Sequence, residues 1–256
     1  MNKESTGAYS KTFRKGLKIL NLFNQDHSGL RLKDIAEKLD LDMMTAYRLV
    51  NTLVLEGYLV KDPDSKLLKL GSKAISLGYR AINTLELMKI SQPLLDEAHD
   101  TLKVSVQLGI LDESRILMLY EKHTRDTLVF LGPRVITALH CSALGKAILA
   151  YLPEEKQAAI IESLDFVRRT DRSILTQDAL HSEIKKTKER GYAINNEEWT
   201  PGLLVIGAPI KSEARDEVLG GVIFAFSTFQ HTMHEVEMKY SQEIIGLAKK
   251  ISEKIP

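Results

Sequence analysis

Two short amphipathic segments joined by a tight turn constrain this sequence more than any other feature. In both segments apolar residues recur at i, i+3, i+4 and i+7, which is the spacing of one helix face. The segments supply Leu32, Ile35, Ala36 and Leu39, and then Ala46, Leu49, Val50 and Leu53. Asp42 is a favourable N-cap for the second helix, and Gly57 is a favourable stop after it. The spacing predicts a helix–turn–helix, whose second helix enters the major groove of DNA.

A hairpin is predicted directly after the second helix. Residues 58–61 and 66–70 have the character of short strands, and the Asp-Pro-Asp-Ser sequence at 62–65 is a strong turn signal. A helix–turn–helix followed at once by a hairpin is a winged one, in which Lys61 and Lys66 stand where the wing meets the DNA backbone. We therefore expect a mainly α-helical winged helix-turn-helix domain over residues 1–73.

The exposed face of the second helix carries side chains that suit DNA. Arg48 can bridge guanine edges and Asn51 can bridge adenine edges. Thr45 and Tyr47 can contact phosphates or a thymine methyl group. An ordinary solvated helix in a bundle is the alternative that periodicity alone leaves open. The predicted DNA contacts are Lys11, Arg14, Lys33, Met43, Met44, Thr45, Tyr47, Arg48, Asn51, Lys61 and Lys66.

Composition narrows the function classes. Residues 1–73 hold 13 Lys and Arg against 9 Asp and Glu, whereas the remainder holds 22 against 25, so the positive charge lies in the predicted DNA-binding part. The single cysteine excludes an intramolecular disulfide and a cysteine-based zinc finger. No apolar run approaches membrane-spanning length, and the N-terminus lacks the apolar core of a signal peptide. We therefore expect a soluble, cytoplasmic protein with no membrane partner.

The rest of the chain mixes helices and strands. Residues 74–90 are expected to form a linker helix, and Pro93 suits the first turn of a following helix that runs to about residue 102. The pattern then predicts strands at 104–111, 115–122, 127–131, 203–210 and 219–228 and helices at 143–152, 178–190 and 235–254. Such a mixture predicts an α+β domain over residues 91–256, and hence an α/β two-domain chain.

Blocks of sequence along residues 10–256 resemble the IclR family of bacterial transcriptional regulators (isocitrate lyase regulator type). The blocks are RKGLKIL at 14–20, the helix–turn–helix block within 34–58, Leu70-Gly71, LHCSALGKA at 139–147, and GYAINNEE at 191–198 with Gly202 and Ala208-Pro209-Ile210. The resemblance implies a GAF-like sheet with one concave face in the second domain, and we expect no cofactor. It also implies homodimers through the N-terminal domain and homotetramers through the effector domain.

The sequence around Ser142 predicts an effector site. Ser142 precedes a helix expected to start at Ala143, and because helix N-termini attract anions, a carboxylate would suit this position. On local sequence alone, a plain capping serine is equally favoured. The resemblance implies that this loop binds small effectors, mostly carboxylic or aromatic acids, and Asn195 and Asn196 can donate hydrogen bonds to an anion. The predicted effector contacts are Ser142, Ala143, Leu144, Gly145, Asn195, Leu203, Val205 and Ser227. Of these, Leu144, Leu203 and Val205 are expected to form an apolar wall.

Two other patterns suggest metal or thiol chemistry. His231 and His234 could hold a metal with Glu235, but no further ligand is well placed, and a surface histidine pair is favoured. Cys141 beside a helix start could be an activated thiol, with His140 as its partner in a Cys-His hydrolase. Neighbouring residues on a strand point to opposite faces, which disfavours that pair. No metal site is therefore predicted.

Catalysis by carboxylates or on phosphates is also weakly supported. Residues 145–147, Gly-Lys-Ala, lack the earlier Gly and the following Ser or Thr of a P-loop. Glu197 and Glu198 could act as general acid and base, although such a pair more often caps a strand. We therefore predict a ligand-responsive regulator, a repressor of a catabolic operon, that binds a palindromic double-stranded DNA operator and a small carboxylic acid. The alternative is a cytosolic enzyme acting on a small organic acid.

Overall fold

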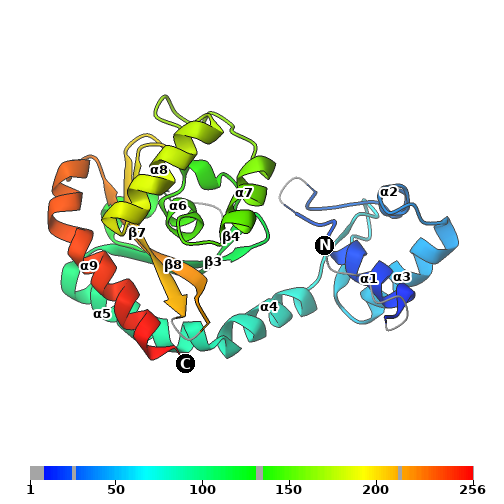
Figure 1. Ribbon diagram of the computed structural model, residues 1–256. Helices are drawn as coiled ribbons and strands as arrows, with labels where there is room; N and C mark the ends of the chain where they lie inside the picture. The colour runs from blue at the N-terminus through cyan, green and yellow to red at the C-terminus, as the bar shows by residue number, and fades with distance from the viewer. Residues whose placement is uncertain (1–8, 25–26, 131–134, 213–214, 256) are drawn as a thin grey trace. The chain divides into compact units, whose positions relative to one another are not determined.

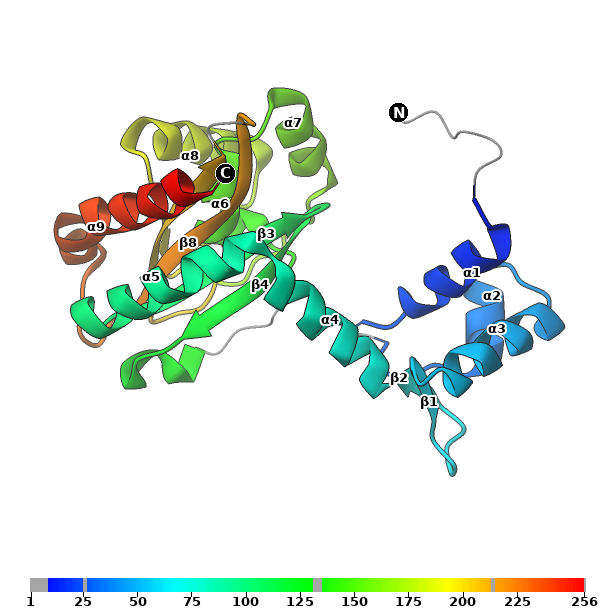
Figure 2. The same ribbon diagram turned by 90° about the horizontal axis from the view of Figure 1, so that it is seen from below.

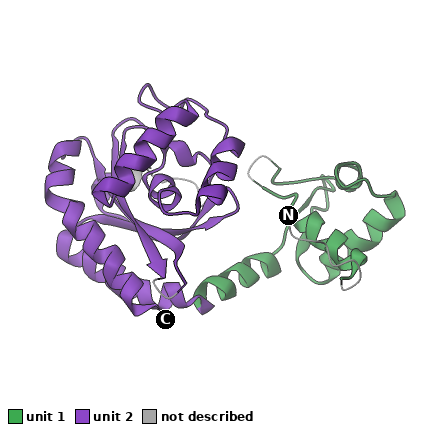
Figure 3. Ribbon diagram, viewed as in Figure 1, with its two compact units in different colours: residues 1–83 green, residues 84–256 purple. Residues whose placement is uncertain are grey.

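The chain folds into two compact units, which are coloured separately in Figure 3. The structure, a computed structural model, describes residues 9–24, 27–130, 135–212 and 215–255. The N-terminal unit spans residues 1–83 and the C-terminal unit spans residues 84–256. A helix–turn–helix with a hairpin is followed by an α+β domain, so the predicted fold class is confirmed. No helix among the described residues is both long and apolar enough to cross a membrane.

The N-terminal unit is a winged helix–turn–helix. Its elements are α1 (Lys11–Leu20), α2 (Leu32–Lys38), α3 (Met43–Leu55), β1 (Leu59–Lys61) and β2 (Leu68–Leu70). As predicted, Asp42 caps α3, because its Oδ1 accepts a hydrogen bond from the Thr45 N–H at 2.8 Å. Gly57 follows the helix with a φ of +75°, a conformation that glycine adopts without strain. The short strands β1 and β2 pair in antiparallel register and form the wing (Figure 2).

Apolar residues from the helices and the wing of this unit meet in one small core. The buried members are Ile19, Leu30, Ile35, Val50, Leu59 and Leu68. Ile35 and Val50 come from the two predicted apolar helix faces, so the i, i+3, i+4 spacing identified the buried sides correctly. Leu30 also forms an isolated antiparallel bridge with Leu68, which ties the wing to the segment before α2.

The segment after the wing differs from the prediction. It contains two helices, α4 (Ser72–Thr84) and α5 (Glu86–Leu102), separated by Leu85 in an extended conformation. Pro93 therefore lies inside α5 and not in its first turn. Proline lacks the N–H that would bond four residues back, but burial of Met88 and Leu95 holds the helix through this position. Packing of the apolar face thus outweighs the local cost of the proline.

A six-stranded antiparallel sheet organises the C-terminal unit. Its strands are β3 (Ser105–Asp112), β4 (Arg115–Lys122), β5 (Val135–Ile136), β6 (Ala193–Asn196), β7 (Leu203–Ser212) and β8 (Glu217–Ser227). Their order across the sheet is β5-β4-β3-β8-β7-β6. Helix α5 and the last helix, α9 (Met233–Lys254), lie side by side on one face, whereas α6 (Ala143–Leu149), α7 (Glu154–Ser163) and α8 (Gln177–Arg190) lie over the other (Figure 1).

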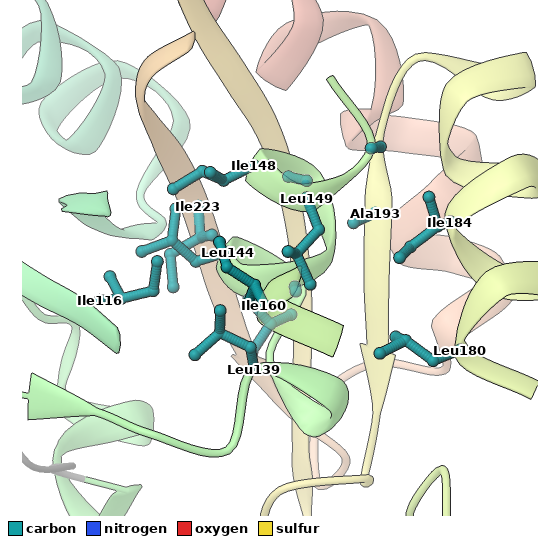
Figure 4. Close-up of a cluster of buried hydrophobic side chains, with 14 of the residues drawn as sticks. Ile116, Leu139, Leu144, Ile148, Leu149, Ile160, Leu180, Ile184, Ala193 and Ile223 are labelled. Carbon is teal, nitrogen blue, oxygen red and sulfur yellow. The ribbon is translucent and has the colours of Figure 1, made fainter. Parts of the chain in front are cut away.

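Helix α6 is the centre of the larger core. All its residues are buried, and Leu144, Ile148 and Leu149 pack among side chains from the sheet, α7 and α8 (Figure 4). Two glycines of the sheet make this approach possible. A Cβ at Gly109 would lie 2.9 Å from Leu144 Cδ2, and one at Gly221 would lie 2.7 Å from Leu144 Cδ1. The absence of side chains there lets α6 lie directly on the sheet.

One predicted strand is a helix. Residues 125–130 form a short 3₁₀-helix, where a strand was predicted over 127–131; residue 131 lies outside the described residues. The hydroxyl of Thr127 bonds that of Ser105, and Ser105 Oγ accepts from the Thr124 N–H at 2.7 Å. These bonds turn the chain back toward β3, which side-chain propensity alone does not reveal. The helix α7 and the short strands β5 and β6 were also not predicted.

Candidate functional site

The outer face of α3 is the first candidate surface. Met43, Met44, Tyr47, Arg48 and Asn51 are exposed on it, and Thr45, beside the N-cap, is half-buried. Exposed polar and apolar side chains thus share the N-terminal half of the predicted recognition helix. Such a face can present donors and apolar groups to base edges in a major groove.

A groove between α2, α3 and the wing collects further predicted DNA contacts. Its lining includes Lys33, Tyr47, Asn51, Lys61 and Lys66. These residues come from three parts of the unit, and together they place ammonium, hydroxyl and amide groups around one depression. Groups of these kinds bind phosphates.

The cations of this unit have different local partners. Lys33 Nζ lies 3.5 Å from Glu37 Oε1 on the exposed side of α2, and the Lys66 ammonium bonds the carbonyl of Pro63. Lys11 and Arg14 lie on α1, outside the groove lining, and Arg14 Nη1 donates to the Tyr9 hydroxyl at 3.2 Å. Exposed contacts of this kind are weak, so each cation can exchange its partner for a phosphate.

The turn of the wing is fixed by Asp62. Its Oδ1 accepts hydrogen bonds from the N–H groups of Asp64 and Ser65 and from the Ser65 hydroxyl. The bonds from Ser65 hold the pKa of Asp62 below its usual range. The charged Asp62 therefore keeps the turn in one conformation between Lys61 and Lys66.

The second candidate site is a cavity in the C-terminal unit, called here the effector cavity. It lies between the sheet and the start of α6, and its empty volume of about 660 Å³ is partly open to solvent. Five of the predicted effector contacts line it, namely Ser142, Ala143, Asn195, Leu203 and Val205. The remaining lining residues are Gln107, Met118, Glu121, His123, Thr127, Ile136, Trp199, Ile223 and Ala225.

Three predicted effector contacts lie outside this lining. Leu144 points onto Gly109 and Gly221 and packs in the core, so it is not part of the apolar wall that was expected. The Gly145 N–H donates to Ser142 Oγ at 3.2 Å, and a Cβ at Gly145 would lie 2.7 Å from the Leu139 carbonyl oxygen. Ser227 Oγ accepts from the Phe229 N–H at 3.2 Å at the end of β8. Ser142 is thus a capping serine as well as a cavity residue.

The side-chain amides of Asn195 and Asn196 make hydrogen bonds within the protein. Asn195 Nδ2 donates to the Cys141 carbonyl at 2.9 Å, and its Oδ1 accepts from the Glu198 N–H at 2.8 Å. Asn196 Oδ1 accepts from Arg172 at 2.9 Å. One N–H of Asn195 therefore holds the loop before α6 against β6. Its amide nitrogen carries a second N–H, so donation from these amides to a ligand stays a prediction.

The polar end of the effector cavity was missed by sequence reasoning. Gln107 on β3 lies directly opposite Glu121 on β4, and Thr127 lies nearby in the lining. Glu121 Oε2 lies 3.3 Å from His123 Nε2, and the two side chains are only 11% and 12% exposed. Polar residues among the apolar residues of a core strand were the signal that could have indicated this end.

A buried ion pair joins α6 to the segment after β6. Lys146 Nζ on α6 donates to both carboxylate oxygens of Glu198, at 2.7 and 2.6 Å. Burial raises the pKa of Glu198, and the nearby Lys146 charge opposes this effect. From the sequence, Lys146 was considered only as part of a P-loop and Glu198 only as a catalytic acid or base. In the structure the two residues bond each other.

The structure does not assemble a catalytic site from either of the two pairs considered from the sequence, Cys141 with His140 and Glu197 with Glu198. Cys141 and His140 lie in a 3₁₀-helix and not on a strand, and both are buried. Burial raises the pKa of the Cys141 thiol and lowers the pKa of His140, which disfavours both charged forms. Glu197 Oε2 accepts from the Gly202 N–H at 2.9 Å, while Glu198 bonds Lys146.

The histidines near the start of α9 do not form a metal centre in the part of the chain that the structure describes. The ring of His231 packs edge-on against Phe226 and Tyr240. Glu235 completes a capping box with Thr232 at the start of α9. No group of three or more His, Cys, Asp or Glu residues within these ranges is arranged to hold a metal ion.

An exposed recognition helix in one unit and a partly enclosed cavity in the other define a DNA-binding protein with an effector domain. Residues 12–63 match the IclR helix-turn-helix domain, and residues 79–253 match the family described as bacterial transcriptional regulator IclR C-terminal. The chain belongs to the IclR family of transcriptional regulators. It is a regulator and not an enzyme, so the enzyme alternative is overturned.

Named relatives match most of the chain. The HTH-type transcriptional regulator BhcR of Paracoccus denitrificans is 31% identical over 207 residues, which cover 80% of this chain and 74% of BhcR. The regulator KdgR of Escherichia coli is 26% identical over 224 residues, covering 86% of this chain and 84% of KdgR. Both matches are longer than either unit alone, so the similarity extends into both units.

Solved structures share the fold. An IclR family regulator from Brucella abortus superposes with a TM-score of 0.77 at 22% identity, covering 100% of this chain and 96% of that one. An IclR homolog from Microbacterium hydrocarbonoxydans, solved in complex with 4-hydroxybenzoate, gives a TM-score of 0.73 at 20% identity and covers 94% and 98% of the two chains.

Proposed function

We propose that this chain represses a catabolic operon and that a small carboxylic acid in the effector cavity changes its affinity for the operator. We further propose that it binds a palindromic operator as a homodimer, that effector domains join dimers into tetramers, and that it acts in the cytoplasm, where bacterial DNA lies. The observation that carries the proposal is the presence of an exposed recognition face on α3 together with a partly enclosed cavity in a separate unit.

The DNA contacts divide into two kinds. Arg48 and Asn51 are exposed on α3 and have the donors that read guanine and adenine edges. Lys33, Lys61 and Lys66 surround the groove beside them and suit phosphates, which position a protein without reading its sequence. A two-fold dimer would repeat both sets at half-sites about one helical turn apart, which is why a palindrome is expected.

The character of the effector follows from the cavity lining. Met118, Leu203, Val205 and Ile223 give the lining apolar side chains, whereas Gln107, Glu121 and His123 give it polar ones. A ligand with a carbon body and one polar head fits this division. The 4-hydroxybenzoate complex of the Microbacterium homolog supports an organic acid as the class to test first.

The test joins ligand binding to DNA binding. Thermal-shift screening of small carboxylic acids should give hits, and each hit should change the affinity for the promoter-flanking DNA of the neighbouring genes, typically by about 5- to 150-fold. Ala143 lines the cavity, so Ala143→Trp should abolish the response and leave operator binding unchanged. Ala159→Trp, at an exposed position on α7, is the matched control.

A second blocking variant separates cavity filling from misfolding. Ala143 is only 2% exposed, and a large side chain there could disturb α6. Val205→Phe narrows the cavity from β7 and should also remove the response, with the unfolding temperature measured for both variants. If hits still shift DNA affinity equally in the wild type and in a folded blocking variant, the effector site lies elsewhere.

The sign of regulation needs a separate measurement. A reporter fused to the same promoter should be expressed more strongly when the gene for this protein is deleted, because an operator without its repressor is free for transcription. Addition of the effector acid should raise expression in the wild-type cell and have no effect in the deletion strain. Lower expression in the deletion strain would identify an activator instead.

A further inference from the structure

Trp199 is the only described residue of the effector cavity lining that has an indole, phenol or phenyl ring. It is half-buried and packs against the core around α6. It is also the single tryptophan of the chain. Aromatic rings prefer to stack on other rings or to meet them edge-on, so this side chain can distinguish a flat ligand from a puckered one.

The loop that carries Trp199 is held from outside the cavity. Residues 169–173, called here the brace, lie between α7 and α8 and are absent from the described lining. Side chains of the brace donate hydrogen bonds to three successive backbone carbonyl groups after β6. The bonds run from Thr170 Oγ1 to Glu197 at 2.7 Å, from Ser173 Oγ to Glu198 at 2.9 Å, and from Arg169 Nε to Trp199 at 3.2 Å. One neighbouring segment thus fixes the backbone up to Trp199.

The backbone of this loop needs such support. Glu197 has a φ of +61°, in the left-handed region that residues other than glycine rarely adopt. Its N–H donates to the Leu203 carbonyl at 3.0 Å, and its carboxylate accepts from the Gly202 N–H at 2.9 Å. Residues in such conformations persist only where the surrounding structure fixes them, and they cluster at ligand sites. The strain two residues before Trp199 therefore favours a binding role for this loop.

Arg169 contacts the indole as well as the backbone of Trp199. Its guanidinium carbon lies 3.8 Å from the centroid of the Trp199 ring, so the cation covers one face of the ring. The neighbouring Arg168 is placed differently, because its Nη1 lies 3.4 Å from a carboxylate oxygen of Asp171. Arg169 can therefore fix the position of the ring, whereas Arg168 makes a separate surface contact.

We infer that Arg169 positions the Trp199 indole as one wall of the effector cavity, and that this ring selects acids whose carbon body is flat and unsaturated. The inference rests on the proposed function, because it describes the acid that the cavity receives. A flat ring gains contact with the indole in addition to burial of its apolar surface, whereas a saturated ring of the same size gains only the burial. The expected preference is about 2- to 12-fold in affinity, as for one aromatic pair.

Matched pairs of acids test the preference. The probes are benzoate with cyclohexanecarboxylate and 4-hydroxybenzoate with 4-hydroxycyclohexanecarboxylate, titrated calorimetrically into the full-length protein at neutral pH. The two members of a pair share the carbon skeleton and the charged carboxylate, and they differ in whether the ring is flat. The flat member should bind more tightly. Because Trp199 is the single tryptophan, protein fluorescence should change along the same titration.

Variants at position 199 assign the preference to the indole. Trp199→Leu keeps an apolar side chain without a ring and should bind the two members of each pair with equal affinity. Trp199→Phe restores a ring and should restore part of the preference. Thermal unfolding shows whether each variant is folded. A loss of stability alone would weaken binding of both members together and leave the ratio of their affinities unchanged.

A variant of the brace tests the positioning. Arg169→Met keeps a long side chain but loses the cation and the hydrogen-bond donor. Its preference for flat acids should shrink, and acrylamide should quench Trp199 fluorescence more strongly than in the wild type, because the ring is no longer covered and held. Arg168→Met removes the exposed neighbour that bonds Asp171, so it is the matched control and should behave as the wild type.

The outcomes separate this inference from the proposed function. If no acid of either kind binds the wild type, the carboxylate part of the proposed function fails and the inference fails with it. If acids bind but the flat and saturated members bind equally, or if Trp199→Leu retains the preference, only the inference is overturned. Unchanged preference and unchanged quenching in Arg169→Met would overturn the positioning role of Arg169.

Discussion

Polar side chains in the C-terminal unit differ in whether they already have a hydrogen-bond partner within the protein. The amide of Asn195 is bonded at both its nitrogen and its oxygen, and the Lys146 ammonium is bonded to Glu198. The Nδ1 atom of His123 has no partner within the described ranges. The Lys146 ammonium therefore serves a structural contact, whereas the Asn195 amide keeps a second N–H beyond the one that holds the loop before α6.

At the same scale, Arg48 is the most informative position for DNA recognition. It is exposed one turn into α3, so Arg48→Ala should cost about 1–3 kcal/mol of specific operator binding, or about 5- to 150-fold in affinity. Fluorescence anisotropy with operator DNA measures the change, and Arg115→Ala, at the exposed start of β4, is the matched control. Wild-type affinity in Arg48→Ala would show that this arginine neither reads nor clamps the operator.

Cys141 should be chemically silent in the folded protein. It is fully buried and burial raises its pKa from the ordinary value near 9, so the reactive thiolate is disfavoured even at pH 8.5. A thiol reagent such as Ellman's should react slowly with native protein and should titrate one thiol per chain in guanidinium chloride, because the sequence has one cysteine. Rapid reaction of the native protein would contradict this account.

At the scale of elements, the spacing of residues predicted individual helices and strands. It did not predict which distant parts of the chain contact each other. The helix pair, the cap at Asp42 and strands β7 and β8 followed from periodicity and local chemistry, because these signals lie within each element. The Lys146–Glu198 contact joins residues 52 positions apart, and it depends on the paths of α6 and of the segment after β6, which a linear pattern does not contain. The cavity residues that β3 and β4 supply were likewise found only through the fold.

Two other predictions of secondary structure were wrong because tertiary contacts oppose the local preference of the sequence. The apolar, β-branched run at 127–131 suits a strand, but the hydroxyl bonds around Ser105 and Thr127 turn the chain into a 3₁₀-helix over 125–130. Pro93 suits a first turn, but the buried face of α5 extends past it in both directions. In both places tertiary contacts outweigh a preference of about 1 to 3 kcal/mol.

The wing is the element whose contribution to DNA binding should be most dependent on salt. Replacing Lys61 and Lys66 by Gln should reduce the slope of log K against log salt by about 0.9 for each phosphate that the variant no longer neutralises, and the proposed dimer has two wings. Lys185 and Lys186, exposed on α8, give a control double variant of equal charge. Operator titrations between about 50 and 200 mM salt measure the slopes. Equal slopes in the wing variant and the wild type would mean that both lysines remain solvated.

At the scale of the whole molecule, α4 is a helix that the single chain leaves without a buried residue. Ile75, Tyr79 and Ile82 follow one of its faces at i, i+4 and i+7. Ile75 is 59% exposed and Tyr79 is 65% exposed. A helix with one apolar face is stable when that face is covered, and a second copy of the chain is the partner that the proposed palindromic operator requires.

Substitution on this face should therefore weaken the proposed dimer. Ile75→Asp with Tyr79→Asp places two charges where an apolar contact is expected and should shift the protein toward monomer in light-scattering measurements at micromolar concentration. Leu77→Asp lies on the opposite side of the same helix and should leave the dimer intact. Operator affinity should fall with dimerisation in the first variant only. An unchanged mass in both variants would place the dimer contact on another surface.

The buried Lys146–Glu198 contact also limits how this sequence can change over generations. Removing either residue alone leaves an unpaired charge in the interior, at a cost of about 3–5 kcal/mol, whereas replacing both by apolar residues of similar volume is often neutral or stabilising. A sequence with both charges and a sequence with neither are thus both tolerated. The sequences between them, which carry only one of the two charges, are poorly tolerated. Selection therefore acts on positions 146 and 198 as a single inherited character, so descendants are expected to retain both charges or neither.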